Sequence, residues 1–248
     1  MRIYGGVQMF NGVKVEPDAV ASGGIVSNGL VFNLLTAPSS GTTWTDATGN
    51  GYNATLNNST SYVSNNGGGI KLNNSAYTGT AYISVPYNIG STTTTIEIIA
   101  SFNPTSNWAT IWGNEAYSSS KGYFAYMVNS TNITWGSPTG NVTSASLTAS
   151  NAIRQWIFVI NGTSKSVYLN GTQVGTTQTV ANPTGGYATG NFYFGARHTN
   201  AGTSFTDVMN NSTSANQPVF YQMRLYNRAL SGSEITQNYD AVKSTYGI

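Results

Sequence analysis

Carboxylate side chains are the first place to look for chemistry in this chain. Hydrolysis of a glycosidic bond needs two carboxyl groups facing one cleft, roughly 5–10 Å apart. The eight acidic residues are instead scattered along the sequence: Glu16, Asp18, Asp46, Glu97, Glu115, Asp207, Glu234 and Asp240. Only the first two lie close together, and they fall in an N-terminal segment that differs from the rest. The spacing predicts no hydrolytic pair, so an enzyme is the least favoured of three functions.

Histidine and cysteine chemistry is equally restricted. His198 is the only histidine, and the chain has no cysteine. A Ser-His-Asp arrangement would have to use His198, yet no G-x-S-x-G nucleophile elbow is present. A single imidazole cannot pair with a second histidine or a thiolate around a metal ion. We expect His198 at a strand end, solvated or hydrogen-bonded.

Asp46 is the acidic residue best placed to hold a cation. It opens the segment DATGNG, where its carboxylate, loop carbonyls and the amide of Asn50 or Asn53 offer the oxygen ligands that Ca²⁺ prefers. Asp46 and Asn50 are therefore the candidate calcium ligands. The alternative is an Asx-turn, in which Asp46 accepts hydrogen bonds from the following backbone N–H groups. We favour the turn, because the loop has one carboxylate.

Tryptophans beside polar loops are the candidates for sugar binding. An exposed aromatic ring can stack on a pyranose while amides and carboxylates bind its hydroxyls. The predicted glycan-binding residues are Trp108, Trp112, Asn114, Glu115 and Trp135. The alternative, favoured for any one tryptophan, is that these rings cover sheet edges or fill a core. Trp44 and Trp156 are assigned to the core outright.

The elements that must position these residues are short strands. Alternating apolar runs separated by Gly, Asn, Pro and Ser are typical of a sandwich or barrel. Residues 95–102 place Ile96 and every second residue after it on one face. Residues 154–160 are apolar on both faces and predict a central strand. Residues 221–225 predict a half-buried strand, with Tyr221, Met223 and Leu225 on the same face.

Local signals mark one hairpin and one helix. Asn170-Gly171, between two apolar runs, predicts a two-residue turn because both residues tolerate positive φ. Ser231 and Glu234 have the spacing of a capping box, and apolar residues follow at helical spacing. The sequence therefore predicts a short C-terminal helix packed on the sandwich. Residues 1–25 are interpreted as an N-terminal arm or attachment segment, and residues 26–248 as the sandwich.

Composition excludes further classes of function. Only 7% of residues are charged, the net charge is +2, and no Lys/Arg cluster is present, so we expect no nucleic-acid partner. No apolar run approaches the roughly 20 residues needed to cross a bilayer, and we expect no membrane insertion. The first residues lack the apolar stretch of a signal peptide. We therefore expect a protein made in the cytoplasm whose polar, nearly neutral surface suits sugars.

Several segments, in order, resemble a known family. Residues 29–34 (GLVFNL) and 43–56 (TWTDATGNGYNATL) are similar to the opening strand and loop of concanavalin A-like, laminin-G-type domains. Ile96-Glu97, and Trp156 followed by residues 167–171 (VYLNG), are similar to the family's middle strands. Residues 224–231 (RLYNRALS) resemble its closing strand and helix. The resemblance spans residues 26–248.

The resemblance implies a jelly roll of two antiparallel sheets that binds carbohydrate or protein, sometimes with Ca²⁺. Two departures from the family pattern limit which of the family's properties this chain is expected to share. The first strand usually continues with an aspartate where this chain has Leu35, which weakens the calcium interpretation. Glucanases of this fold carry two or three acids on the strand that here holds Glu97 alone. We expect an all-β, non-enzymatic domain with no cofactor beyond the candidate calcium.

Domains with the YNRALS ending are similar to parts of bacterial surface proteins and of tailed-phage virions. The favoured hypothesis is a virion structural protein of a tailed phage: a capsid decoration, head fibre or tail-associated protein that binds host glycans weakly. It would lie on the virion surface, contact other virion proteins through residues 1–25 and form homo-oligomers. The alternative is a carbohydrate-binding or adhesin module on a bacterial cell surface. This choice rests on family analogy.

Overall fold

The computed structural model describes residues 2–4, 7–10, 13–15, 24–74, 81–102, 109–114, 121–127, 132–143, 150–186, 190–200, 204–206 and 217–248. Within these ranges, only the backbone is described for residues 2–15, 141–143, 150, 198–200 and 204–206.

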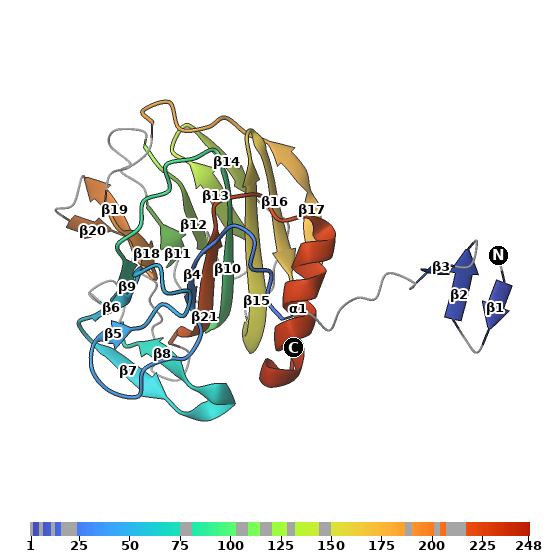
Figure 1. The fold of residues 1–248 in the computed structure, drawn as a ribbon. Helices are drawn as coiled ribbons and strands as arrows, with labels where there is room; N and C mark the ends of the chain where they lie inside the picture. The colour runs from blue at the N-terminus through green and yellow to red at the C-terminus, as the bar shows by residue number, and fades with distance from the viewer. Residues whose placement is uncertain are drawn as a thin grey trace.

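Two large antiparallel sheets form the body of the protein (Figure 1). The first sheet runs in the order β17 (Thr172–Thr179), β16 (Ser164–Leu169), β15 (Ser150–Asn161), β10 (Thr93–Phe102), β21 (Val219–Tyr226), β8 (Gly69–Leu72) and β7 (Thr60–Val63), and β4 (Leu30–Leu34) pairs with β21. The second sheet runs in the order β14 (Gly140–Thr143), β13 (Ile133–Ser137), β12 (Phe124–Met127), β11 (Ala109–Gly113), β18 (Phe192–Phe194), β9 (Tyr82–Val85), β6 (Ala54–Asn57) and β5 (Thr43–Trp44). The predicted all-β, two-sheet sandwich is confirmed.

Smaller elements complete the described chain. A 3₁₀ turn, η1 (Asn65–Gly67), joins β7 to β8, and a hairpin pairs β19 (Arg197–Asn200) with β20 (Ser204–Thr206). No helix among the described residues is long and apolar enough to cross a membrane.

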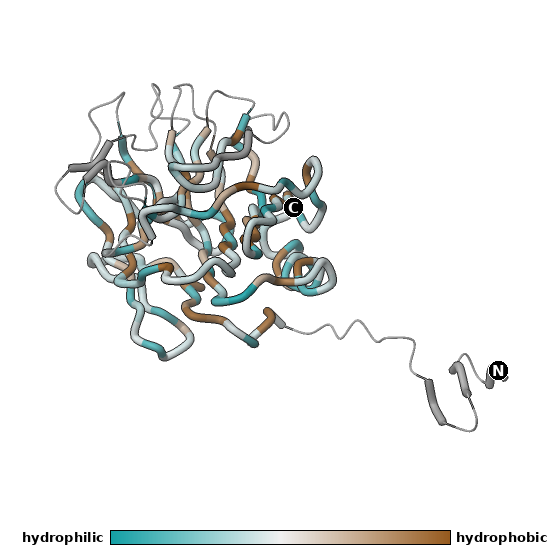
Figure 2. Tube along the Cα trace, turned by 90° about the horizontal axis from the view of Figure 1, so that it is seen from above, coloured by the Kyte–Doolittle hydropathy of each residue, from teal (hydrophilic) through white to brown (hydrophobic). Residues whose placement is uncertain are grey.

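The strands bury their apolar residues between the sheets. Side chains of β10 alternate, so that Ile96 and Ile98 face the second sheet while Glu97 and Ile99 face outward. Trp44 and Trp156 lie in the core, as predicted, with 0% and 3% of their surfaces exposed. In the view from above, brown hydrophobic residues alternate in short stretches with white and teal residues along the tube (Figure 2).

One predicted face is wrong. The sequence places Tyr221 with Met223 and Leu225, but the pairing of β21 with β10 shifts by one residue between Ile99 and Ala100. This bulge turns Tyr221 to the outer side, where it packs against the ring of Tyr246 at 5.7 Å between centroids. A single inserted residue reverses the side-chain alternation beyond it.

The C-terminal helix α1 (Gly232–Tyr246) covers the outer face of the first sheet. The predicted capping box is present: the Ser231 hydroxyl accepts from the Glu234 backbone N–H, and the Glu234 carboxylate accepts from the Ser231 backbone N–H. Gly247 ends the helix in the left-handed conformation, at φ 66°. Buried residues of α1 pack in two small apolar clusters on the sheet.

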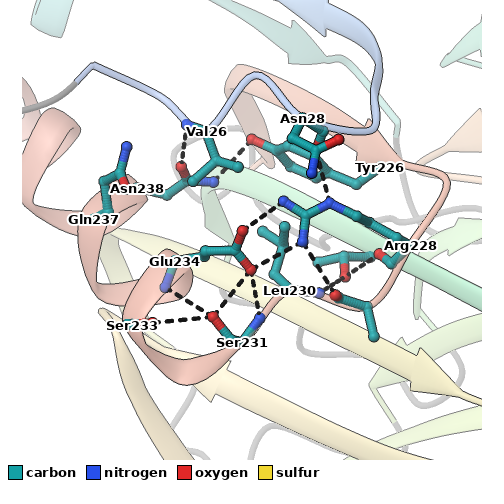
Figure 3. Close-up of polar contacts among 12 residues, drawn as sticks. Val26, Asn28, Tyr226, Arg228, Leu230, Ser231, Ser233, Glu234, Gln237 and Asn238 are labelled. Carbon is teal, nitrogen blue, oxygen red and sulfur yellow. Dashed lines mark hydrogen bonds and ion pairs between the residues drawn. The ribbon is translucent and has the colours of Figure 1, made fainter.

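The YNRALS segment joins the end of β21 to this helix (Figure 3). Arg228 makes two hydrogen bonds to the Glu234 carboxylate, at 2.9 and 2.6 Å, and donates through Nε to the carbonyl of Asn28. Asn238 accepts from the backbone N–H of Val26 at 2.9 Å, and Gln237 donates to the carbonyl of Gly24. The segment from Gly24 to Asn28 is therefore held against α1.

The strands β1 (Arg2–Tyr4), β2 (Val7–Phe10) and β3 (Val13–Val15) form a separate three-stranded sheet. Among the described residues they pair only with one another. Figure 1 shows them beside the sandwich, outside both large sheets. The boundary at residue 25 and the attachment role of this segment remain predictions.

Candidate functional site

The structure places two of the predicted sugar-binding residues in the core. Trp112 has no exposed surface and stacks on Phe192 at 5.6 Å, and Trp135 is 1% exposed and packs edge-on against Phe158. A ring enclosed on both faces cannot stack on a sugar. The expectation that Trp112 and Trp135 present an exposed platform is corrected: they fill the sandwich, which was the structural alternative.

Asn114 is a buried turn residue at the end of β11. Its side chain accepts from the backbone N–H of Tyr123 at 3.3 Å and donates to the side chain of Asn88 at 3.1 Å. Asn114 therefore fixes the ends of neighbouring strands. Trp108 and Glu115 lie outside the described residues, and of His198 only the backbone is described, in β19.

Asp46 organises the loop that begins at the end of β5. One carboxylate oxygen accepts from the backbone N–H groups of Asn33 and Thr48 at 2.9 and 3.0 Å. The other accepts from the Thr48 hydroxyl at 2.7 Å and from the Tyr52 N–H at 3.3 Å. Burial alone would raise the pKa of Asp46, but these hydrogen bonds lower it below its ordinary value.

This geometry fits an Asx-type loop rather than a calcium site. Both oxygens of Asp46 already accept hydrogen bonds, and the Asn50 side chain donates to the carbonyl of Val31 at 2.8 Å. A calcium ion would need six to eight oxygen ligands, usually with more than one carboxylate. The part of the chain that the structure describes holds no group of three or more acidic, histidine or cysteine residues around one point. Asp46 accepts hydrogen bonds from the backbone of its loop, as the favoured alternative predicted, and Asn50 supports the same loop.

Glu97 lies on the outer face of the first sheet, beneath helix α1, and is fully buried. Its carboxylate pairs with Arg224 at 2.8 Å and accepts from Gln155 at 2.9 Å and from Asn238 at 2.7 Å. Asn238 also donates to the hydroxyl of Tyr226. The described partners of Glu97 therefore tie the helix to the sheet, and its fully buried carboxylate faces no cleft among the described residues.

A series of polar and aromatic contacts links loops at one end of the sandwich, which we call the loop end. It starts at Asp46, which binds the Tyr52 backbone, and continues through the Tyr52 and Tyr87 rings, whose centroids lie 5.1 Å apart. Asn88 follows Tyr87 in sequence and binds Asn114. Segments far apart in sequence therefore meet at this end, from the Asp46 loop to the end of β11.

The series ends at a buried cation. The hydroxyl of Tyr123 donates to Asn182 at 3.3 Å, and the Lys165 ammonium lies 5.9 Å from the centroid of the Tyr123 ring. Lys165 has no exposed surface, and its Nζ donates to the carbonyl of Val180 at 2.9 Å. Burial lowers the pKa of Lys165 to about 8.

Sequence reasoning missed the two partly exposed tyrosines of the loop end. Tyr52 and Tyr87 are partly buried, and both pack on the main core. Tyr52 stands inside the same segment as Asp46, three residues after the start of its Gly-Asn-Gly run, so a search for aromatics beside that loop would have found it. No local signal marked Tyr87, which comes from the β9–β10 connection.

Comparison with known proteins gives a match to a family model and to solved folds. The model described as "Concanavalin A-like lectin/glucanases superfamily" matches residues 66–236, well over half of the chain. The sandwich with its C-terminal helix agrees with the jelly roll of that superfamily. A search of curated protein sequences gave no match.

Several similar solved structures are clostridial toxin domains. The binding domain of Paraclostridial Mosquitocidal Protein 1 is 18% identical, with a TM-score of 0.62 over 85% of this chain and 52% of the other. A structure titled "Cell entry of botulinum neurotoxin type C is dependent upon interaction with two ganglioside molecules" is 13% identical, with a TM-score of 0.64 over 86% and 51%. The binding domain of botulinum neurotoxin DC, in complex with rat synaptotagmin II, is 11% identical, with a TM-score of 0.63 over 86% and 52%. This chain spans about half the length of these neighbours, and at such identities the likeness concerns the fold.

Proposed function

This chain belongs to the concanavalin A-like lectin/glucanase superfamily, and from that premise we propose that it is a non-enzymatic module that binds glycans. The observation that carries the proposal is the loop end, where half-buried tyrosines and asparagine amides from separate loops meet. Rings and amides of this kind suit sugars, which offer apolar faces and many hydroxyls. Among the neighbours of the same fold, one neurotoxin interacts with two ganglioside molecules and another binding domain forms a complex with rat synaptotagmin II, which supports recognition as the role.

The non-enzymatic part of the proposal rests on the acidic residues that the structure describes. Glu97 and Arg224 neutralise each other beneath the helix, and Asp46 is committed to backbone N–H groups. Glu234 and Asp240 lie on α1, paired with Arg228 and Lys243. None of these four carboxylates faces another across an open site, which glycosidic chemistry would require.

A glycan array tests this proposal directly. The full chain, labelled at a surface amine, is applied to immobilised neutral, sialylated and sulfated oligosaccharides, with the heat-unfolded protein as control. We expect saturable binding to at least one class, and no release of reducing ends when the same oligosaccharides are incubated in solution. Absence of binding to every class would reject glycan recognition, and product release would reject the non-enzymatic assignment.

We further propose that the module is carried on a tailed-phage particle through the N-terminal segment, predicted as residues 1–25, with carriage on a bacterial cell surface as the alternative. In support, β1–β3 pair with one another and the sandwich begins at the pinned segment Gly24–Asn28. Deletion of residues 1–23 should abolish incorporation into particles while leaving the circular dichroism of the sandwich unchanged. Incorporation of the truncated chain would contradict the proposed attachment.

A further inference from the structure

Within this proposed function, we propose that Tyr52 and Tyr87 form the contact platform of a saccharide site at the loop end, and that its ligand is a neutral hexopyranose unit. The inference concerns where the sugar lies and which class it belongs to, so it can fail while glycan binding by the module stands.

The two rings are held in a fixed arrangement. Tyr52 and Tyr87 meet edge to face, with 5.1 Å between centroids and 83° between planes. Tyr87 in turn packs edge to face on the buried ring of Phe32, with a centroid separation of 6.3 Å. Both tyrosines pack against the main core yet retain exposed surface. A platform whose rings are already fixed loses little conformational entropy when a ligand binds.

The hydroxyls of both tyrosines are open to a ligand as far as the described residues show. In the part of the chain that the structure describes, neither phenol oxygen takes part in a hydrogen bond. Burial raises the pKa of Tyr87, and the neighbouring Tyr52 raises it further, so its hydroxyl stays protonated at neutral pH. A protonated phenol can donate to one sugar oxygen and accept from another.

Asparagines beside the tyrosines add unused polar groups. The Asn88 side chain accepts through Oδ1 from Asn114, which leaves its NH₂ group without a partner among the described residues. The Asn50 side chain donates through Nδ2 to the carbonyl oxygen of Val31. The side-chain oxygen of Asn50 therefore has no hydrogen-bond partner among the described residues. One donor and one acceptor amide group therefore lie in the loops that carry the two rings.

The charges of the loop end argue for a neutral ligand. Asp46 is 5% exposed and its oxygens accept from backbone N–H groups, while Lys165 has no exposed surface and is bound to a carbonyl. Neither offers a charge to a carboxylate or sulfate on a sugar. Within the series from Asp46 to Lys165, the groups that keep exposed surface are rings, hydroxyls and amides, which suits an uncharged hexose.

A second tyrosine pair provides a matched control. Tyr82 and Tyr193 lie on the outer face of the second sheet, also edge to face, with 5.8 Å between centroids and 71° between planes. Both are partly buried, as Tyr52 and Tyr87 are. A Tyr→Ala change there removes the same atoms from a similar pair away from the loop end.

The experiment compares Tyr52→Ala, Tyr52→Phe and Tyr193→Ala with the wild type on the array of neutral, sialylated and sulfated oligosaccharides, followed by isothermal titration with the best-bound soluble oligosaccharide. We expect the wild type to prefer neutral glycans. Tyr52→Ala should weaken binding about tenfold or more, Tyr52→Phe should retain part of the affinity, and Tyr193→Ala should bind as the wild type does. Circular dichroism and the melting temperature establish that each variant is folded.

The other possible results would each overturn the proposed site, the proposed ligand class or both. Unchanged affinity of a folded Tyr52→Ala protein would overturn this site while leaving glycan binding intact, and loss on Tyr193→Ala would place the site on the sheet face. A preference for sialylated or sulfated glycans would overturn the neutral class. A wild type that binds nothing would overturn both the proposed function and this inference. If Tyr52→Ala fails to fold, Tyr52→Phe and Asn88→Ala take its place, and unchanged affinity in both would overturn the site.

Discussion

Lys165 makes the stability of this protein depend on pH in a way that one substitution should remove. The folded protein holds the pKa of this buried ammonium at about 8, against an ordinary value of 10.5. That difference corresponds to about 3 kcal/mol of extra cost for the charged form. Below pH 8 the folded state bears this cost in full, and it disappears as pH rises from 8 to 10.5, where only the unfolded chain still binds the proton. The contribution of Lys165 therefore increases with pH across that window.

Replacing Lys165 with methionine should separate this effect from the rest of the protein. Methionine fills most of the same volume but loses the hydrogen bond to the Val180 carbonyl, worth about 1 kcal/mol. We expect Lys165→Met to be more stable than the wild type by about 1–2 kcal/mol at pH 7, and equal or less stable at pH 10. The assay is urea unfolding followed by tryptophan fluorescence at several pH values.

Ionisation of tyrosines also changes the free energy of unfolding near pH 10, so the comparison must remove their contribution. Burial raises the pKa of Tyr226, and it raises that of Tyr246 to about 12, so both proteins lose stability as unfolded tyrosines ionise near pH 10. The difference between variant and wild type removes that common loss. A difference that stays constant from pH 7 to pH 10, or a variant that is less stable at pH 7, would refute the reasoning about Lys165.

Four further outcomes follow from the described contacts. Asp46→Asn should lower the free energy of unfolding by about 2 kcal/mol at neutral pH, and by less below pH 4, because the lowered pKa makes the stabilising charge disappear as acid protonates it. Millimolar calcium should leave the wild-type melting temperature unchanged, since the Asp46 oxygens are occupied; a clear increase would contradict this. Glu97→Leu should cost about 3–5 kcal/mol by leaving Arg224 charged and buried, measured by urea unfolding. Gly122→Ala should greatly reduce the yield of folded protein, because φ is +74° and a Cβ there would collide with the Asn114 carbonyl.

The elements specified by local physics were predicted from the sequence. The capping box at Ser231 and the Asn170-Gly171 turn need only neighbouring residues, and the structure confirms both, with φ of 48° and 74° at the turn. The alternation of β10 and the double-sided apolar pattern of β15 gave the two-sheet architecture, because burial on one or two faces is visible as a period of two.

The features that depend on long-range packing were not predicted. Whether Trp112 is buried or exposed depends on the opposing sheet, which its neighbours in sequence do not encode. Lys165 follows a turn and would be taken for a solvated residue, yet the crossing chain at Val180 encloses it. Tyr52 and Tyr87 are 35 residues apart and meet because their loops leave the sandwich at the same end. Only the resemblance to a family, through the order of its motifs, gave information on contacts between residues far apart in the sequence.

The distribution of charge explains why recognition is assigned to the loop end. The first sheet has helix α1 over its outer face, and the Glu97–Arg224 pair lies beneath that helix, where no ligand can reach it. The Arg228–Glu234 pair fixes the helix to the strand before it and to the segment at Asn28. In a chain with 7% charged residues, ion pairs used in this way leave few charges for binding. A surface built from hydroxyls, amides and aromatic edges attracts polyanions only weakly. Such a surface can still form hydrogen bonds to the hydroxyls of a neutral sugar and pack against its apolar face, which is why the proposed ligand is an uncharged glycan.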